Sequence, residues 1–310
     1  MIRVVFMGTP DFSVPVLEGL INCNLCEVVG VVSQPDKKVG RHQVLTPSPI
    51  SRVALDNNIK LLRIERVRKD YQDILALEPD MIITCAYGQI IPKELLDYPK
   101  YGCINVHASL LPKLRGGAPI HRAIIDGYSK TGITIMYMDE GMDTGDIISQ
   151  KEIEILDTDT VEILHDKLSV IGRELLLDTL PNIISGNINR VKQDSSEVSF
   201  AYNIKREDEH IDFSKNSRDV FNLVRGLNSF PGAFTILDKK IIKVYSGRIG
   251  TSTNGVCGEI INIYSDGIGV RTGDGEYIIT ELKEEGRKKV TVKDYLNGKN
   301  KKDLLGKIFE

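Results

Sequence analysis

The sequence contains no tryptophan, and none of its apolar runs approaches the roughly 18 residues that a transmembrane helix needs. The apolar run at residues 1–6 is also too short for the hydrophobic region of a secretory signal peptide. With 310 residues, 41% of them hydrophobic, the chain can still bury a sizeable core, and its length favours two domains. We therefore expect a two-domain protein of the cytoplasm.

Cysteine is scarce, and its pattern does not indicate a metal site. The five cysteines are an odd number, and no second Cys/His pair lies near Cys23 and Cys26 to complete a zinc site. These two have the C-x-x-C spacing of redox proteins, but in thioredoxin-like proteins such a pair opens a helix, whereas here it follows a helical segment. We expect free thiols.

Glycine-rich nucleotide motifs are also missing. The first predicted strand, residues 3–6, is followed by a single glycine, Gly8, and the chain contains neither G-x-G-x-x-G nor G-x-x-x-x-G-K-[ST]. Dinucleotide-dependent and P-loop chemistry are therefore not expected.

Charge is nearly balanced overall, at −3, but it is distributed unevenly. Residues 205–310 hold 19 basic and 16 acidic residues, against 21 and 27 in residues 1–204. Such an excess fits a polyanionic partner, and it fits an ordinary solvated surface as well.

Apolar runs of strand character alternate with segments of helical period along the first half of the chain, which predicts a βαβα order. The runs at residues 81–83 and 103–106 are typical of strands covered on both faces, as in a parallel sheet. A long helix begins near Asp159, where Asp159 and Glu162 can cap its first turn, and ends in the region 181–186. We predict an α/β fold with an open, mostly parallel sheet, spanning residues 1–189.

After about residue 190 the sequence becomes polar, which indicates a linker at 190–206. A helix at 217–226 and short strands bounded by Gly, Asp, Asn or Ser follow. Strands at this spacing predict a small, OB-like C-terminal β-barrel over residues 207–310.

Two polar side chains lie at the end of the strand 103–106. Ligands bind beyond the carboxyl ends of strands in open α/β sheets, and Asn105 and His107 are two residues apart, so both point to the same face there. Either residue alone could be a satisfied polar group. Together, an amide donor and an imidazole can stabilise an oxyanion and move a proton.

A second polar loop, residues 139–146, follows the predicted strand 133–138. It lacks the residue order of a calcium loop, and a plain turn would explain its Asp and Gly residues. Pairing of neighbouring strands could nevertheless bring Asp143 to His107, where the carboxylate would orient the ring and favour its protonated form.

Further motifs surround these residues in a definite order: Asn105-x-His107, Ser109-Leu110-Leu111-Pro112-Lys113, Arg115-Gly116, Ala118-Pro119, Thr131-Gly132-Ile133-Thr134 and Asp143-x-Gly145-Asp146. In order and spacing they resemble the core of the folate-dependent formyltransferases. That family has members with different acceptors, and the core does not distinguish among them.

Motifs outside the core resemble the members that act on charged initiator tRNA. In the first domain these are the segments 7–12, 34–41 with 47–49, and 86–92, and in the C-terminal third the segments 202–208, 224–233, 273–275 and 294–298. One departure is Phe230, where these relatives more often have Trp before Pro-Gly. An aromatic ring is kept, so we expect little change in function.

The resemblance implies a Rossmann-like formyltransferase domain that uses 10-formyltetrahydrofolate as donor and methionyl initiator tRNA as acceptor, without a metal or a membrane, in a monomeric enzyme. It implies that Asn105 donates to the formyl oxygen, that protonated His107 stabilises the oxyanion, and that Asp143 orients His107. By the same analogy the folate pocket is lined by Ser109, Leu110, Leu111 and Pro112. The implied tRNA contacts are Lys37, Lys38 and Arg41, in a long loop at 34–49, with Lys205 and Arg206.

Three other interpretations stay open at this point. A related enzyme could formylate a small amine such as a sugar nucleotide, but it would not need the C-terminal barrel for RNA. A hydrolase of formyltetrahydrofolate would release formate without an acceptor. An RNA-binding protein with an inactive formyltransferase fold is disfavoured by the presence of Asn105, His107 and Asp143.

Overall fold

The computed structural model describes residues 1–40, 42–298 and 300–310, which form two compact units. Unit one comprises Met1–Pro119, Lys130–Glu154 and His165–Tyr202, and unit two comprises Ile120–Ser129, Ile155–Leu164 and Asn203–Glu310. Two short internal segments, Ile120–Ser129 and Ile155–Leu164, thus belong to unit two. The boundaries expected from the sequence, at 189 and 207, stay a prediction.

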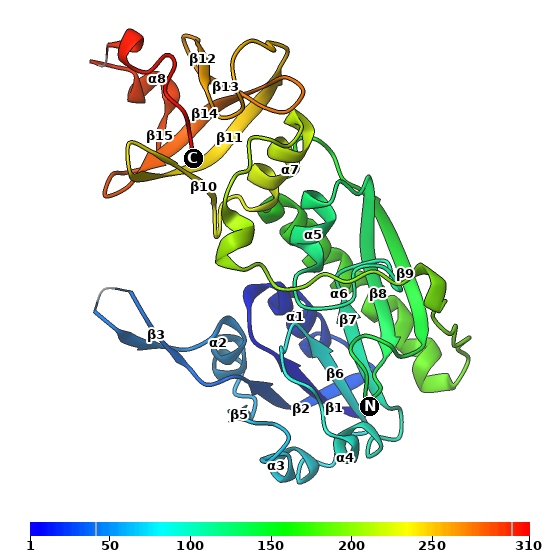
Figure 1. Cartoon of the computed structure of the whole chain (residues 1–310). Coiled ribbons are helices and arrows are strands. Elements are labelled where there is room, and N and C mark those ends of the chain that lie inside the picture. The colour runs from blue at the N-terminus through cyan, green and yellow to red at the C-terminus, as the bar shows by residue number, and fades with distance from the viewer. Residues whose placement is uncertain (41, 299) are drawn as a thin grey trace. The chain divides into compact units, whose positions relative to one another are not determined.

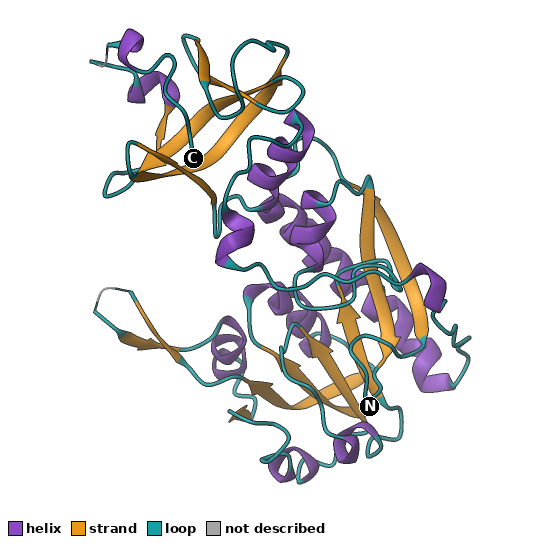
Figure 2. Cartoon of the chain, in the orientation of Figure 1, coloured by secondary structure: helices purple, strands orange, loops and turns teal. Residues whose placement is uncertain are grey.

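Unit one contains a seven-stranded sheet in the order β5-β2-β1-β6-β7-β8-β9 (Figure 2). The first five strands in this order pair in parallel, and β8 and β9 are antiparallel. This confirms the predicted open, mostly parallel sheet. The strands are β1 (Ile2–Gly8), β2 (Cys26–Ser33), β5 (Leu61–Arg63), β6 (Met81–Cys85), β7 (Cys103–His107), β8 (Lys130–Tyr137) and β9 (Ile147–Glu154).

Helices cover both faces of this sheet, which explains why its central strands are continuously apolar. Val5 and Met7 of β1 pack in one core with Ile74 and Leu95, whereas the glycine at position 172 approaches Val106 of β7 on the opposite face. The helices of unit one are η1 (Asp11–Ser13), α1 (Val14–Ile21), α2 (Pro49–Asp56), α3 (Gln72–Leu75), α4 (Lys93–Leu96), α6 (Val161–Ser185) after its first turn, and η2 (Ser195–Glu197). Helix α5 (Pro119–Ile125) belongs to unit two from Ile120 on.

The long predicted helix is α6, and its start differs by one residue from the expected cap. The Thr160 hydroxyl accepts a hydrogen bond from the Ile163 amide at 3.3 Å, whereas the Asp159 carboxylate accepts one from Leu156 in the preceding turn. Thr160 is therefore the N-cap, and Glu162 lies in the first turn as expected. In the described part of the chain, no helix has both the length and the apolar character to cross a membrane.

Strand order places the carboxyl ends of β1, β6 and β7 together at one edge of the sheet. Met7 pairs with Thr84, and Thr84 pairs with Asn105. The chain turns from one side of β1 to the other at this point, so the edge lies at a topological switch point, where open α/β sheets bind their ligands.

The segment predicted as a long loop at 34–49 forms a small hairpin of β3 (Lys37–Val39) and β4 (Val44–Thr46). Lys37 pairs with Thr46 and Lys38 with Leu45. Figure 1 shows this hairpin extending away from β2 and α2. The expectation of an irregular loop was therefore wrong for these six residues, although Lys37, Lys38, Val44 and Leu45 are exposed to solvent as expected.

Unit two is built on an antiparallel sheet in the order β10-β11-β14-β13-β12, with β15 paired to β14. Its core is apolar and includes the fully buried ring of Tyr277. Its strands are β10 (Ala233–Leu237), β11 (Lys240–Gly250), β12 (Ile260–Ile263), β13 (Ile268–Arg271), β14 (Glu276–Glu284) and β15 (Val290–Thr291). Its helices are η3 (Arg206–Glu209), α7 (Ser217–Gly226), α8 (Val292–Tyr295) and η4 (Lys301–Asp303).

The segment 306–310 connects the two outer strands of this sheet. The Ile260 amide donates to the Lys307 carbonyl at 2.8 Å, and Ile236 and Glu310 exchange two backbone hydrogen bonds at 3.0 and 3.1 Å. Because β10 and β12 are the ends of the strand order, these bonds close the sheet. The predicted small C-terminal barrel is confirmed.

Candidate active site

Asn105 lies on β7 with its side-chain amide held in one orientation. The Thr84 hydroxyl on the neighbouring strand donates to the Asn105 Oδ1 at 2.8 Å. Thr84 is buried, whereas Asn105 is half-buried. Because the oxygen of the amide is occupied, the Nδ2 group is the one left to donate to a ligand.

His107 ends the same strand and is only 6% exposed. Its Nε2 lies 3.1 Å from the Leu114 carbonyl oxygen, and its Nδ1 lies 3.6 Å from the Asp143 Oδ1. Both ring nitrogens thus face oxygen acceptors. Because a carbonyl oxygen can only accept a hydrogen bond, Nε2 is the donor in its contact with Leu114.

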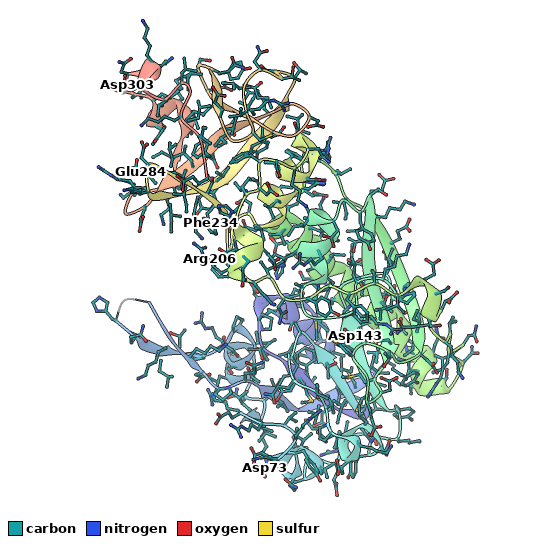
Figure 3. The ribbon with its side chains drawn as sticks, viewed as in Figure 1. Asp73, Asp143, Arg206, Phe234, Glu284 and Asp303 are labelled. Atoms are coloured by element: carbon teal, nitrogen blue, oxygen red, sulfur yellow. The ribbon has the colours of Figure 1, made fainter. Side chains whose placement is uncertain are left out.

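Asp143, labelled in Figure 3, lies in the loop after β8, as the sequence predicted. Its backbone has φ +54°, a left-handed conformation in which Asp is among the better tolerated residues. Its Oδ2 accepts a hydrogen bond from the Gly116 amide at 2.9 Å, while Oδ1 faces His107. The structure therefore brings Asp143 and His107 together at the end of the strand that carries Asn105.

Gln193 holds the Asp143 loop and was missed by sequence reasoning. Its Nε2 donates to the carbonyl oxygens of Asp143 and Gly145, both at 2.8 Å. Its Oε1 accepts from the Nε and Nη2 of Arg115, at 3.0 and 2.7 Å. Gln193 lies in the stretch interpreted as a linker, and no motif there distinguishes a glutamine that spans two loops from a solvated one.

The rest of that polar stretch is bonded to the loop that touches His107. The Ser199 hydroxyl accepts from the Leu114 amide, and the Ser199 carbonyl accepts from the Arg115 amide, both at 2.9 Å. Ala201 then donates to the Arg115 carbonyl at 2.7 Å. Residues 193–201 thus form part of the wall of the site.

The segment expected to line the folate pocket follows β7 directly. Thr134 donates to the Ser109 carbonyl at 2.6 Å and accepts from the Leu111 amide at 3.1 Å, and Gln150 donates to the Leu111 carbonyl at 2.9 Å. Ser109 and Leu111 are buried, whereas Leu110 and Pro112 are partly exposed. The Leu111–Pro112 peptide bond is cis. Side chains on β8 and β9 thus fix the backbone of this segment.

The basic residues expected to contact RNA lie on two separate elements. Lys37 and Lys38 are exposed on β3, and Arg41 lies outside the described residues. Lys205 and Arg206 are exposed at the start of unit two, where the Arg206 guanidinium lies 3.9 Å from the centre of the Phe234 ring and pairs with Glu209 (Figure 3). A phosphate at Arg206 would therefore compete with Glu209.

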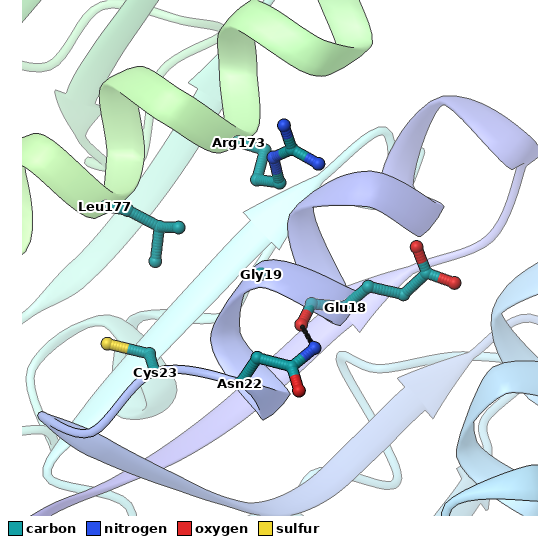
Figure 4. Close-up of a pocket in the computed structure, with 6 residues that line it drawn as sticks. All are labelled: Glu18, Gly19, Asn22, Cys23, Arg173 and Leu177. Carbon is teal, nitrogen blue, oxygen red and sulfur yellow. Dashed lines mark hydrogen bonds between the residues drawn. The ribbon is translucent and has the colours of Figure 1, made fainter.

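A shallow hollow elsewhere in unit one lies between α1 and α6 (Figure 4). It is lined by Glu18, Gly19, Asn22, Cys23, Arg173 and Leu177. None of these is a predicted site residue. The hollow has no feature that indicates catalysis.

All five cysteines are free thiols, as expected from the sequence. Burial raises the pKa of the Cys85 and Cys103 thiols to about 12, so both stay protonated at neutral pH. Burial is also the main cause that raises the pKa of Cys26 to about 12, with a further contribution from Cys23. Cys257 is the exposed one.

Comparison with known sequences supports the resemblance over nearly the whole chain. The Formyl transferase family model matches residues 2–180, and the model of the formyl transferase C-terminal domain matches residues 203–300. A methionyl-tRNA formyltransferase of Bacillus velezensis is 51% identical, covering 100% of this chain and 99% of the relative. The chain belongs to the methionyl-tRNA formyltransferase family. The enzyme of that name from Bacillus subtilis is likewise 51% identical, over 99% of this chain and 98% of the relative.

Solved structures of the wider family share the fold. An N-formyltransferase from Helicobacter canadensis, in complex with folinic acid and dTDP-3-aminofucose, superposes with a TM-score of 0.67 at 22% identity, covering 94% of this chain and all of that one. At this identity the likeness concerns the fold alone. The assignment to the methionyl-tRNA formyltransferase family therefore rests on the relatives that are 51% identical in sequence.

Proposed function

We propose that the protein transfers the formyl group of 10-formyltetrahydrofolate to the α-amino group of methionine on initiator tRNA, for translation initiation. The single observation that carries the chemistry is the group at the end of β7: the oriented Asn105 amide and the His107–Asp143 pair. We choose methionyl-tRNA as the acceptor because the chain belongs to the methionyl-tRNA formyltransferase family.

Asn105 supplies the donor for the developing charge. When the amine attacks the formyl carbon, a C–N bond forms and the carbonyl oxygen becomes an oxyanion, to which the Asn105 Nδ2 donates. Collapse then breaks the bond to N10 of the folate. The attacking amine gives up a proton, and N10 takes one, so the proton count is unchanged.

His107 and Asp143 act on the same oxyanion and on the proton. In the free protein the His107 Nε2 donates to the Leu114 carbonyl. To donate to the substrate oxygen instead, Nε2 must first break this hydrogen bond. Asp143 keeps the other ring nitrogen opposite a negative charge. The segment of Ser109, Leu110, Leu111 and Pro112 would hold the folate, because Thr134 and Gln150 fix its backbone next to His107.

The acceptor assignment is tested by offering the purified protein 10-formyltetrahydrofolate with methionylated initiator tRNA, methionylated elongator tRNA, or no acceptor. We expect formylmethionyl-tRNA from the initiator and far less from the elongator. Equal transfer to both tRNAs would contradict the initiator preference. Formate release without an acceptor, at the rate of tRNA formylation, would favour a hydrolase instead.

Lys37 and Lys38 on the hairpin would contact the tRNA backbone, together with Arg41, Lys205 and Arg206. Each phosphate that a cation neutralises releases counterions, so tRNA binding should weaken as salt is raised. The double variant Lys37→Ala/Lys38→Ala should lower the slope of log affinity against log salt by roughly one to two.

The matched control for that measurement is Lys93→Ala, which removes an exposed lysine at the start of α4 that pairs with Asp97. We expect its salt slope to equal that of the unaltered protein. Equal slopes for the control and for the hairpin variant would exclude the hairpin lysines as phosphate contacts, while leaving the formyl transfer assay to decide the activity.

A further inference from the structure

Two aromatic rings stack on each other at the surface of unit one. Phe200 and Tyr202 have their ring centres 5.6 Å apart and their planes within 12° of parallel. Phe200 is 46% exposed and Tyr202 is 63% exposed. Single exposed aromatic rings are ordinary, but a parallel pair presents a flat apolar face to solvent, as stacking sites for bases do.

The backbone holds this pair in place. Ala201, between the two rings, is fully buried, and the alternation of an extended segment turns residues 200 and 202 outward together. The Ala201 amide donates to the Arg115 carbonyl at 2.7 Å, and the Ala201 carbonyl accepts from the Ala118 amide at 3.0 Å. The two rings therefore lie on an extended segment that backbone hydrogen bonds hold to the Arg115 loop.

This extended segment runs along the loop that forms one wall of the site. Phe200 makes a parallel bridge with Arg115, and the preceding residue, Ser199, accepts from the Leu114 amide. The Leu114 carbonyl is the oxygen that lies 3.1 Å from the His107 Nε2. The stacked rings are thus connected to the proposed catalytic histidine through two hydrogen bonds, one between Ser199 and Leu114 and one between Leu114 and His107.

We propose that Phe200 and Tyr202 form a stacking platform for the unpaired nucleobases at the acceptor end of charged tRNA. This inference rests on the proposed function and extends it by assigning a binding site to that part of the substrate. The amino acid whose amine reacts is esterified to the last nucleotide of a single-stranded end, so bases of that end must pass close to His107. Unstacked bases of single-stranded RNA are commonly held on exposed aromatic faces.

The alternative is that the two rings only stabilise the extended segment on which they lie. Leucine keeps apolar bulk but cannot stack on a base, so Phe200→Leu/Tyr202→Leu separates the two roles. The ring-exchanged variant Phe200→Tyr/Tyr202→Phe keeps both aromatic faces and serves as the rescue. Tyr98→Leu removes another exposed ring, 45% exposed, and is the matched control.

The experiment measures kcat/KM for formyl transfer with two acceptors. One is a methionylated acceptor-stem RNA with an intact single-stranded end, and the other has abasic nucleotides at the unpaired positions before the last one. Thermal unfolding and the KM for 10-formyltetrahydrofolate are recorded for every variant, because a change in fold would alter both acceptors and the folate together.

We expect the double leucine variant to lose between roughly fivefold and 100-fold in kcat/KM on the intact acceptor. On the abasic acceptor it should differ from the unaltered protein by less than about twofold, because the bases that stack are absent. The ring-exchanged variant and Tyr98→Leu should match the unaltered protein on both acceptors.

A double leucine variant that formylates the intact acceptor as well as the unaltered protein would overturn the platform and leave the proposed function standing. An equal loss on both acceptors would also overturn it, because the loss would then not depend on the bases. If the unaltered protein formylates neither acceptor nor full-length charged tRNA, the proposed function itself fails, and the platform fails with it.

Discussion

Replacing Gln193 should slow formyl transfer although this residue touches neither substrate. Its amide donates to the Asp143 and Gly145 carbonyls and accepts from two nitrogens of Arg115. Gln193→Glu keeps the acceptor for Arg115. It removes both donors, however, and puts a carboxylate oxygen about where an N–H group now faces two carbonyl oxygens.

The magnitude follows from these contacts. Two lost neutral hydrogen bonds cost about 1–3 kcal/mol of unfolding free energy. The larger effect is on geometry, because Asp143 has a left-handed backbone that the surrounding bonds must hold. A displacement of about 1 Å in a positioning group can cost on the order of 10²-fold in turnover. We therefore expect kcat to fall roughly 10- to 100-fold, with little change in the KM for the folate.

The assay is steady-state formylation of methionyl-tRNA, with a thermal unfolding curve for each variant. Gln193→Met keeps the length of the side chain without its polar groups, and it should slow turnover similarly. The control is Asn57→Asp, the same change from amide to carboxylate at the end of α2, where the amide donates to the Val53 carbonyl. Variants of Gln193 that lose stability but keep kcat within twofold of the unaltered protein would refute the positioning role.

Other substitutions test the remaining parts of the site. Asn105→Ala and His107→Ala should each lower turnover at least about 10²-fold with the fold retained, and near-normal turnover in either would exclude the proposed mechanism. Thr84→Val should lower kcat about tenfold by releasing the Asn105 amide, and Thr84→Ser should restore it; identical rates for Val and Ser would rule out the hydroxyl as the orienting group. Alkylation of the native protein at pH 8 should modify the exposed Cys257 and spare Cys103, because burial raises the pKa of the Cys103 thiol to about 12 and the reactive thiolate stays rare below that pH. Rapid modification of Cys103 in the folded protein, read by mass spectrometry, would contradict this burial.

The parts of the fold that the sequence predicts are those with a strong local pattern. The strands β6 and β7 are short continuous apolar runs, and period-two alternation is enough to put Asn105 and His107 on one face. The hairpin of β3 and β4 was missed because its strands are three residues long, and Val44 and Leu45 are exposed, so no buried face marks them. Two strands of this kind look like a loop in sequence.

In the site, too, the sequence predicts the residues that follow strands and misses the one that lies in a polar loop. Asp143 could be placed near His107 only by assuming that the strand before it lies beside β7, and the antiparallel pairing of His107 with Thr134 provides that link. Gln193 lies 50 residues after Asp143, in a polar stretch with the composition of a linker. Its role depends on tertiary contacts between three loops, and such contacts leave no periodicity in a single sequence.

The short segment 306–310 also protects the second unit from association with other molecules. Without it, the Ile236 and Ile260 backbones would each present unpaired N–H and C=O groups on an outer strand, the arrangement through which sheets of separate molecules pair. Proteolytic removal of five residues would thus do more than weaken a fold. It would open the closed barrel and expose two unpaired edge strands. The first sign of such damage would be oligomers and aggregates of a protein whose catalytic residues are all intact.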